Sequence, residues 1–211
     1  MNLPRVYPIL DTQALEARGC EPETAARAFL DGGARILQFR HKSHWTRATF
    51  EQAERIAELC RDRGAVFVVN DRADAAMLFE AGLHVGQDDL NPTEVRRLLG
   101  PDAVVGYSTH NSEQLGEAGA QPVNYVAFGP IFGTVSKQNP DPMVGLEQLE
   151  KCGASCLRPL VAIGGITRQN ARAVFAAGAD TVAVIADLLP EPCTSGTLRR
   201  RMEEWQQLAQ K

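Results

Sequence analysis

Short apolar runs rich in β-branched residues recur along the whole chain. Their hydrophobic positions are continuous rather than alternating, as in the strands of a parallel sheet that is buried on both faces. Between them lie segments with apolar residues at helical spacing, such as Phe50, Ala53, Ile56, Ala57 and Cys60. The pattern predicts eight strands alternating with helices, at residues 6–10, 35–39, 66–69, 83–85, 104–107, 125–128, 160–163 and 181–185.

Small residues stand just before many of these strands. Examples are Gly32-Gly33-Ala34, Gly64-Ala65 and Gly178-Ala179, where glycine accepts the left-handed conformation that closes a helix. Eight strand–helix units predict a single-domain (β/α)8 barrel over residues 1–211. An open doubly wound sheet is the alternative, which the lack of a G-x-G-x-x-G turn after the first strand disfavours.

Composition narrows the functional classes. The 211 residues are 44% hydrophobic and 23% charged, typical of a soluble globular domain. A net charge of -4 argues against a broadly basic surface for nucleic acid. Neither a membrane span nor a signal peptide is expected from the apolar runs or from the first residues. The five cysteines show no C-x-x-C spacing, which favours reduced thiols over a disulfide or zinc site and predicts a cytoplasmic protein.

Charged residues follow several of the predicted strands, where a (β/α)8 barrel carries its catalytic groups. Arg40 and Lys42 follow the second strand, and Lys137 lies in the long connection after the sixth strand. These cations suit a diphosphate. Asp71 and Asp89, from two different strand ends, suit Mg²⁺, which needs only one or two carboxylates when phosphates and water complete its ligands. Plain salt bridges between these acids and bases are the alternative.

A second anionic feature is predicted after the seventh strand. Gly164 and Gly165 precede a helical stretch that is expected to begin near Thr167. Free backbone N–H groups and the helix dipole make such a place an anion site, and barrels often bind phosphate after strands seven and eight. The sequence therefore predicts two phosphorylated substrates, or one long one.

Other polar residues carry weaker hypotheses. His41 and His44 are spaced for a metal, but the flanking cations oppose it. His84, inside a strand, is predicted to be a structural histidine of the barrel interior. His110 follows a strand and is either an acid or base or a structural hydrogen-bonding group. The arginine run at 199–201 is expected to be a solvated helix face.

Six motifs, in order, resemble the thiamine-phosphate synthase (thiamine-phosphate pyrophosphorylase) family over nearly the whole chain, from Tyr7 to about Leu189. They are Q-x-R-x-K at 38–42, V-N-D at 69–71, H-V-G-Q-D-D at 84–89, G-x-S-x-H at 106–110, G-P-I-F-x-T-x-S-K at 129–137 and A-I-G-G-I at 162–166. Each motif alone is weak evidence for the family, but six motifs in this order at suitable spacings are specific for it.

The resemblance implies a transferase of thiamine biosynthesis. It would condense 4-amino-2-methyl-5-hydroxymethylpyrimidine diphosphate with 4-methyl-5-hydroxyethylthiazole phosphate by a Mg²⁺-assisted dissociative substitution, releasing thiamine phosphate and diphosphate. The residues implied are Gln38, Arg40, Lys42, Asn70, Ser108 and Lys137 for the pyrimidine diphosphate, Asp71 and Asp89 for Mg²⁺, and Thr134, Ser136, Gly165, Ile185 and Ala186 for the thiazole phosphate. Arg40, Lys42, Ser108 and Lys137 are expected to serve catalysis.

Three positions depart from the family pattern. Gly133 stands where members often have Pro, and Ser136 stands where they usually have Thr. Ala186 stands where they commonly have Ser, so one hydroxyl donor to the thiazole phosphate is missing. We expect a weaker affinity for the thiazole phosphate unless backbone N–H groups compensate.

Two other functions stay open at this point. A paralogous thiazole tautomerase would bind the thiazole phosphate without joining it, and would need neither the metal acids nor the diphosphate-binding lysine. A non-catalytic thiamine-precursor-binding protein would be expected to lose the same residues. Retention of Asp71, Asp89 and Lys137 favours the synthase. Oligomeric state, including a homo-oligomer, is left open.

Overall fold

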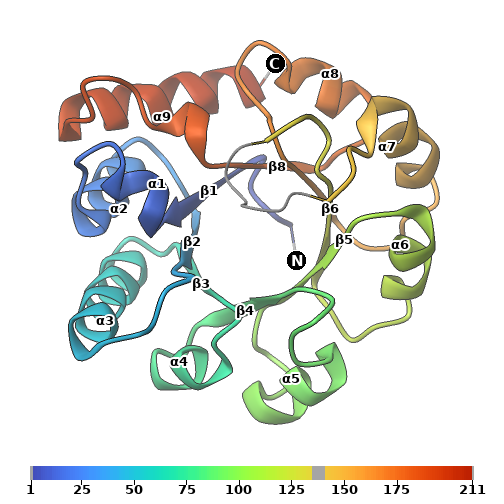
Figure 1. Cartoon of the computed structure of the whole chain (residues 1–211), viewed down its shortest axis with the longest axis horizontal. Helices are drawn as coiled ribbons and strands as arrows, with labels where there is room; N and C mark the ends of the chain where they lie inside the picture. The colour runs from blue at the N-terminus through green and yellow to red at the C-terminus, as the bar shows by residue number, and fades with distance from the viewer. Residues whose placement is uncertain (1, 135–140, 211) are drawn as a thin grey trace.

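The computed structural model describes residues 2–134 and 141–210. Within them, eight parallel strands close into a barrel, each paired with the next and β8 paired with β1 (Figure 1). The strands are β1 (Val6–Asp11), β2 (Ile36–Arg40), β3 (Val66–Asn70), β4 (Gly82–Val85), β5 (Val105–Thr109), β6 (Tyr125–Phe128), β7 (Leu160–Ile163) and β8 (Thr181–Val184). The predicted (β/α)8 fold is confirmed, with strand ends shifted by two residues at most.

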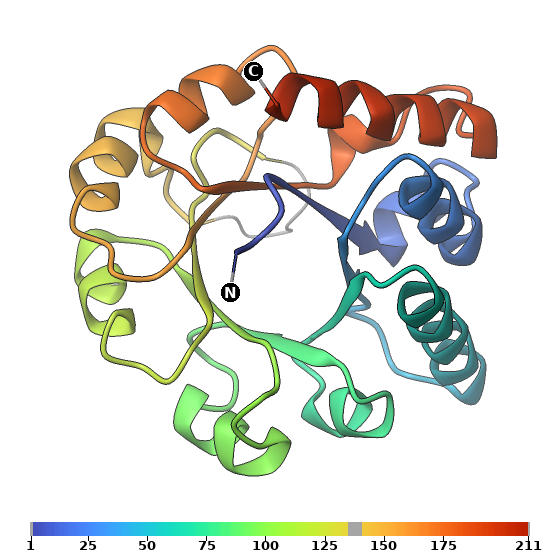
Figure 2. The same cartoon turned by 180° about the vertical axis from the view of Figure 1, so that it is seen from behind.

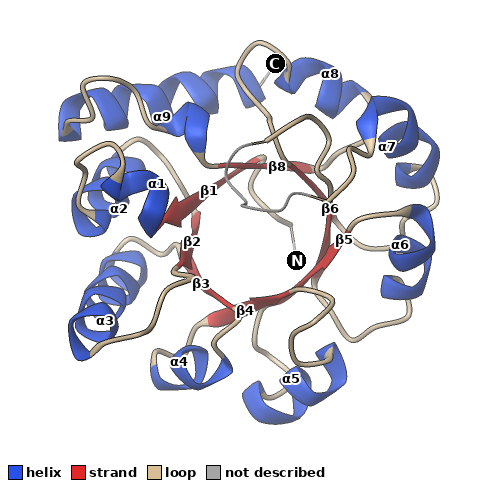
Figure 3. Cartoon of the chain, in the orientation of Figure 1, coloured by secondary structure: helices blue, strands red, loops and turns tan. Residues whose placement is uncertain are grey.

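Helices surround the strands as an outer ring, which is visible from both ends of the barrel (Figures 2 and 3). They are α1 (Thr12–Glu16), α2 (Pro22–Asp31), α3 (Arg47–Asp62), α4 (Ala73–Leu78), α5 (Pro92–Leu99), α6 (Ser112–Ala118), α7 (Gly145–Gly153), α8 (Ala171–Ala176), the 3-10 turn η1 (Ala186–Leu188) and α9 (Ser195–Ala209). Threonine capping boxes at Thr46 and Thr194 fix the starts of the two longest, α3 and α9. None of the described helices is long and apolar enough to cross a membrane.

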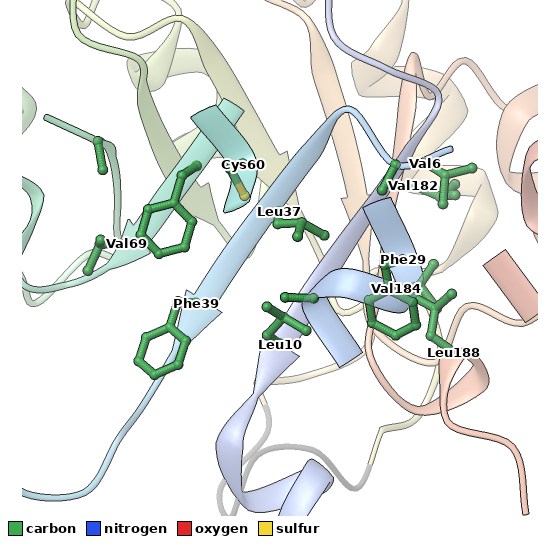
Figure 4. Packing of buried hydrophobic residues seen from close by; sticks show 14 of the residues in the cluster. Val6, Leu10, Phe29, Leu37, Phe39, Cys60, Val69, Val182, Val184 and Leu188 are labelled. Carbon is green, nitrogen blue, oxygen red and sulfur yellow. The ribbon is translucent and has the colours of Figure 1, made fainter. Parts of the chain in front are cut away.

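Strand side chains alternate between two cores. Outward residues such as Leu10 and Val184 pack against the helices, and Figure 4 shows this layer around Phe29 of α2. Inward residues such as Tyr7 and Tyr125 form a smaller core inside the barrel. Because each strand is covered on both sides, its apolar run is continuous, as the sequence pattern indicated.

The first part of the connection that follows β6 lies against the end of β7. The N–H of Ile131 donates to the carbonyl of Ile163 (2.9 Å), and the N–H of Phe132 donates to Gly164 (3.0 Å). Gly164 has φ +98° and Gly165 has φ +63°. A Cβ on Gly165 would lie 2.5 Å from the carbonyl oxygen of Gly133, so only glycine allows this approach.

Two predictions about helices are wrong. The helix expected near Thr167 begins at Ala171, because Asn170 closes a turn before it. The Asn170 Oδ1 accepts from the N–H of Thr167 (2.8 Å) and its Nδ2 donates to the carbonyl of Gly165 (3.0 Å). The arginine run at 199–201 is not wholly solvated, since Arg201 is only 19% exposed and donates to the carbonyl of Asp187.

Candidate active site

A cavity of 260 Å³ opens at the carboxyl ends of the strands. Residues from all eight strands or their following loops line it, as expected when parallel strands meet at one edge. Its walls carry apolar side chains such as Ile9, Val161 and Ile163 beside charged and amide groups. An apolar cavity with a few convergent polar groups is the usual form of a small-molecule site.

Arg40 is held at the rim by a buried carboxylate. It ends β2 directly opposite Asp11, which ends β1, and the two side chains form an ion pair. Asp11 also accepts from the N–H of Ala14 (2.9 Å) and so caps α1. The guanidinium is therefore oriented before any ligand binds.

Asp71 and Asp89 lie beside each other and close to Lys42. Lys42 forms an ion pair with Asp71, whose backbone is left-handed with φ +63° and whose N–H donates to the carbonyl of His84 (2.8 Å). Asp89 accepts from the N–H of Gly86 (2.7 Å). Burial raises the pKa of the Asp89 carboxyl, the Gly86 N–H opposes this, and the neighbouring Asp71 raises the pKa further.

This carboxylate pair fits a hard cation. Two oxygen donors are held side by side, and their mutual repulsion is what a divalent ion would relieve. Among the described residues, no group of three or more His, Cys, Asp or Glu side chains is placed to hold a metal. Asp71 and Asp89 are the residues that would hold Mg²⁺.

Asn70 presents a polar group that the described protein does not satisfy. Its side chain is buried at the end of β3 and lines the cavity. Its Nδ2 has no hydrogen-bond partner among the described residues. Because a buried donor without a partner is costly, a ligand acceptor is the expected partner.

Five side chains form a continuous chain of hydrogen bonds on the barrel floor, which we name the floor network. Gln38 Nε2 donates to the Tyr7 hydroxyl (3.1 Å), which contacts the Tyr125 hydroxyl (2.9 Å). Tyr125 contacts His84 Nδ1 (3.0 Å), and His84 Nε2 contacts the Ser108 hydroxyl (2.8 Å). His84 is thus a satisfied histidine of the barrel interior, as predicted.

The loops after β6, β7 and β8 form the remaining wall. Thr134, Gly165, Ile185 and Ala186 line the cavity there. Asp187, next to Ala186, accepts from Arg168 Nε (3.0 Å) and from Trp205 Nε1 (2.9 Å). These bonds tie the start of η1 to the β7 loop and to α9.

His41 and His110 bond to groups in neighbouring loops. His41 Nδ1 bonds to the Thr12 hydroxyl (2.8 Å), and its Nε2 lies 3.3 Å from the carbonyl of His44. His110 Nδ1 donates to the carbonyl of Gly129 (2.7 Å). His110 therefore makes the hydrogen bond expected of a structural histidine, while its Nδ1 also lies 3.5 Å from Asp141 Oδ2 and its side chain lines the cavity. The contacts of His41 are with a hydroxyl and a main-chain carbonyl.

Comparison with known proteins decides the family. The family model described as thiamine monophosphate synthase matches residues 6–188. The chain belongs to this family. It is 44% identical to the thiamine-phosphate synthase of Koribacter versatilis, over 99% of this chain and 97% of that protein. The solved thiamine phosphate pyrophosphorylase of Pyrococcus furiosus superposes with a TM-score of 0.83 at 30% identity, over 98% of this chain and 95% of that chain.

Membership makes the chain an enzyme of the transferase class, and its cavity gathers most of the residues that the family resemblance implied. The cavity-lining members of that set are Gln38, Arg40, Lys42, Asn70, Asp71, Asp89, Ser108, Thr134, Gly165, Ile185 and Ala186. Ser136 and Lys137 lie outside the described residues. The binding and catalytic roles of the set stay predictions.

Sequence reasoning missed four residues of this family member's site. Asp11 ends the first strand, whereas the predicted charged residues of the site begin with Arg40 after the second strand. Tyr7 and Tyr125 could have been found from the inward alternation of β1 and β6. Asp187 follows Ala186 at the end of the last strand, but its partners Arg168 and Trp205 are distant in sequence and give no local signal.

Proposed function

We propose that the chain joins 4-amino-2-methyl-5-hydroxymethylpyrimidine diphosphate to 4-methyl-5-hydroxyethylthiazole phosphate, forming thiamine phosphate and diphosphate. One observation carries the proposal. A single cavity combines the paired cations and carboxylates of the β1–β4 ends with the glycine-rich loops of the β6–β8 ends. The names of the relatives support the same reaction.

The pyrimidine diphosphate occupies the β1–β4 side in this proposal. Arg40 and Lys42 bind the diphosphate, and their partners Asp11 and Asp71 hold both side chains near the rim. Asn70 offers to the same ligand its Nδ2, which has no partner among the residues that the structure describes. Asp71 and Asp89 would hold Mg²⁺, with phosphate oxygens and water as further ligands. When bound, this ion supplies Lewis-acid stabilisation of charge on the leaving diphosphate.

The thiazole phosphate occupies the β6–β8 side. Thr134, Gly165 and the Ile185–Ala186 segment line that wall, and the family resemblance adds Ser136. Binding the thiazole through its phosphate orients the ring nitrogen toward the pyrimidine, which lowers the entropic cost of attack. Ala186 provides no hydroxyl, so backbone N–H groups carry more of this contact.

The bond changes require little proton transfer. The carbon–oxygen bond of the pyrimidine diphosphate breaks, the electron pair leaves with diphosphate, and the thiazole nitrogen donates its lone pair to the resulting pyrimidine-methyl cation. Arg40, Lys42 and Lys137 stabilise the charge that develops on the departing diphosphate. The apolar wall of Ile9, Val161 and Ile163 keeps water from the cation.

The experiment is incubation of the purified chain with both substrates and Mg²⁺, with thiamine phosphate detected by mass spectrometry. Product is expected only when both substrates are present. The Asp89→Asn variant, which removes one proposed metal ligand, is expected to lose product formation. No thiamine phosphate from the unmodified chain, or full activity of Asp89→Asn, would count against the proposal.

A further inference from the structure

The floor network crosses five strands without a break. Gln38 lies on β2, Tyr7 on β1, Tyr125 on β6, His84 on β4 and Ser108 on β5. Tyr7 is 1% exposed and Tyr125 is fully buried. Each polar hydrogen in such a place needs an acceptor within the protein, so the order of donors and acceptors is constrained.

That order follows from one end of the network. The Gln38 amide nitrogen can only donate, so the Tyr7 oxygen accepts from it. The single Tyr7 proton then goes to the Tyr125 oxygen. The Tyr125 proton goes to His84 Nδ1. His84 therefore carries its proton on Nε2 and donates it to Ser108.

Packing fixes the two phenols in this arrangement. The ring of Tyr125 stacks on His84 and meets the ring of Tyr7 edge to face, at centroid distances of 5.6 and 5.9 Å. A Cβ on Gly106 would lie 2.1 Å from Tyr125 Cζ, so the absence of a side chain there lets the hydroxyl reach His84. Burial raises the pKa of both phenols, which therefore keep their protons.

The two ends of the network present opposite hydrogen-bonding groups to a ligand, an acceptor at one end and a donor at the other. Gln38 donates through Nε2, so its carbonyl oxygen is the atom that can accept from a ligand in the cavity. Ser108 accepts from His84, so its hydroxyl proton can be donated to a ligand. A 4-aminopyrimidine matches this order, because its exocyclic amine donates and its ring nitrogens accept.

We propose that the floor network selects a 4-aminopyrimidine over its 4-oxo analogue, with Tyr7, Tyr125 and His84 as positioning residues. The inference rests on the proposed function. The family resemblance gives Gln38 and Ser108 to the pyrimidine diphosphate and both line the cavity, so we place the pyrimidine between them. The exocyclic oxygen of the 4-oxo analogue is an acceptor. It would face the Gln38 carbonyl oxygen, which is also an acceptor, so no hydrogen bond could form between them. Discrimination of this kind arises from a buried polar group that is left unpaired.

The first test needs no ligand. Long-range proton–nitrogen NMR spectra of the ¹⁵N-labelled chain report the tautomer of each histidine, and the His84→Asn variant assigns the His84 signals. The expected result is a neutral His84 with its proton on Nε2. A proton on Nδ1, or on both nitrogens, would overturn the inference, whether or not the chain makes thiamine phosphate.

The second test measures selection. Calorimetric titration gives Kd values for the monophosphates of 4-amino- and 4-oxo-2-methyl-5-hydroxymethylpyrimidine, which lack the diphosphate leaving group. In Tyr7→Phe the Gln38 amide is free to rotate, so the preference for the amino compound should fall by about tenfold. Tyr107→Phe is the matched control, because Tyr107 bonds to Gln87, which contacts the main-chain carbonyl of Ser108 and not a side chain of the network. The preference of this variant should not change.

An unchanged preference in Tyr7→Phe, or an equal loss of affinity for both compounds, would assign the network a purely structural role. If Tyr7→Phe does not fold, the tautomer of the unmodified chain decides the inference. If neither pyrimidine binds to the unmodified chain, the proposed function and the selection fail together, while the His84 tautomer stands as a separate result.

Discussion

Charged residues at the rim of the cavity are already paired before a substrate is present. Lys42 contacts Asp71, as the salt-bridge interpretation of the sequence predicts. It also lines the cavity, as the substrate-binding interpretation requires. The residue types at the strand ends could be predicted because parallel strands end at one edge. The partner of Arg40 could not, because Asp11 is 29 residues away and only the strand register brings the two together.

Asn70 should matter for binding but not for stability. Its Nδ2 has no partner among the described residues, so Asn70→Ala should raise the KM for the pyrimidine diphosphate by about tenfold without lowering the free energy of unfolding. Asn124→Ala is the matched control. Asn124 accepts from the N–H of Val105 (2.8 Å) and from Arg96 (2.9 Å), so its loss should cost about 1–3 kcal/mol of stability. Urea denaturation and steady-state kinetics check both variants, and destabilisation of Asn70→Ala would contradict the account.

Lys137 should act on turnover more than on thiazole phosphate binding. Lys137→Ala removes a cation proposed to stabilise the leaving diphosphate, so kcat should fall by about a hundredfold, while the Kd for thiazole phosphate changes little. Lys151→Ala, which removes an exposed lysine paired with Glu147, should leave both values unchanged. Unchanged turnover in Lys137→Ala would remove this residue from the mechanism.

Strands were easier to predict than the loops and helix starts that complete the site. Continuous apolar runs report burial directly, so every strand was found. The start of α8 was misplaced because Thr167 and Asn170 are both good capping residues within one turn, and the side chain of Asn170 closes that turn. Only the spatial arrangement shows how closely the β6 loop lies on Gly164 and Gly165.

The contact between the β6 and β7 loops should determine thiazole phosphate affinity. Gly165→Ala combines a left-handed backbone with a Cβ placed 2.5 Å from the Gly133 carbonyl oxygen, so the loops must separate. We expect the KM for thiazole phosphate to rise by about tenfold.

Gly178→Ala is the matched control for Gly165→Ala. Gly178 has φ +99° but nothing within 4 Å of an added Cβ. The Gly178→Ala variant should lose about 1–2 kcal/mol of stability from backbone strain alone, and its KM for thiazole phosphate should not change. Equal KM values in the two variants would show that the loop contact does not shape the site.

At the scale of the whole molecule, the net charge does not reveal the concentration of charged side chains at the rim of the cavity. A net charge of -4 argued against nucleic acid but gave no information about a small polyanion. The closed barrel brings Asp11, Arg40, Asp71 and Asp89 to one rim from four strand ends. The fold and the family could be predicted from the sequence. The pairing of these charges and the floor network could not, because only the barrel geometry brings the residues together.

Metal removal should stop the reaction without unfolding the barrel. The described fold is held by two apolar cores, and the proposed ion contacts only two strand-end carboxylates. Chelation should therefore abolish thiamine phosphate formation, and excess Mg²⁺ should restore it. Circular dichroism and the thermal midpoint should not change. Activity that survives chelation, or loss of structure on chelation, would contradict this part of the account.

The most direct test of the central claim is phosphorus NMR of one reaction containing the purified chain, Mg²⁺ and both substrates. The signals separate the pyrimidine diphosphate, thiazole phosphate, thiamine phosphate and free diphosphate. We predict that thiamine phosphate and diphosphate appear in a one-to-one ratio as both substrates disappear. Diphosphate without thiamine phosphate, isomerisation of the thiazole phosphate alone, or no change in any signal would contradict the claim.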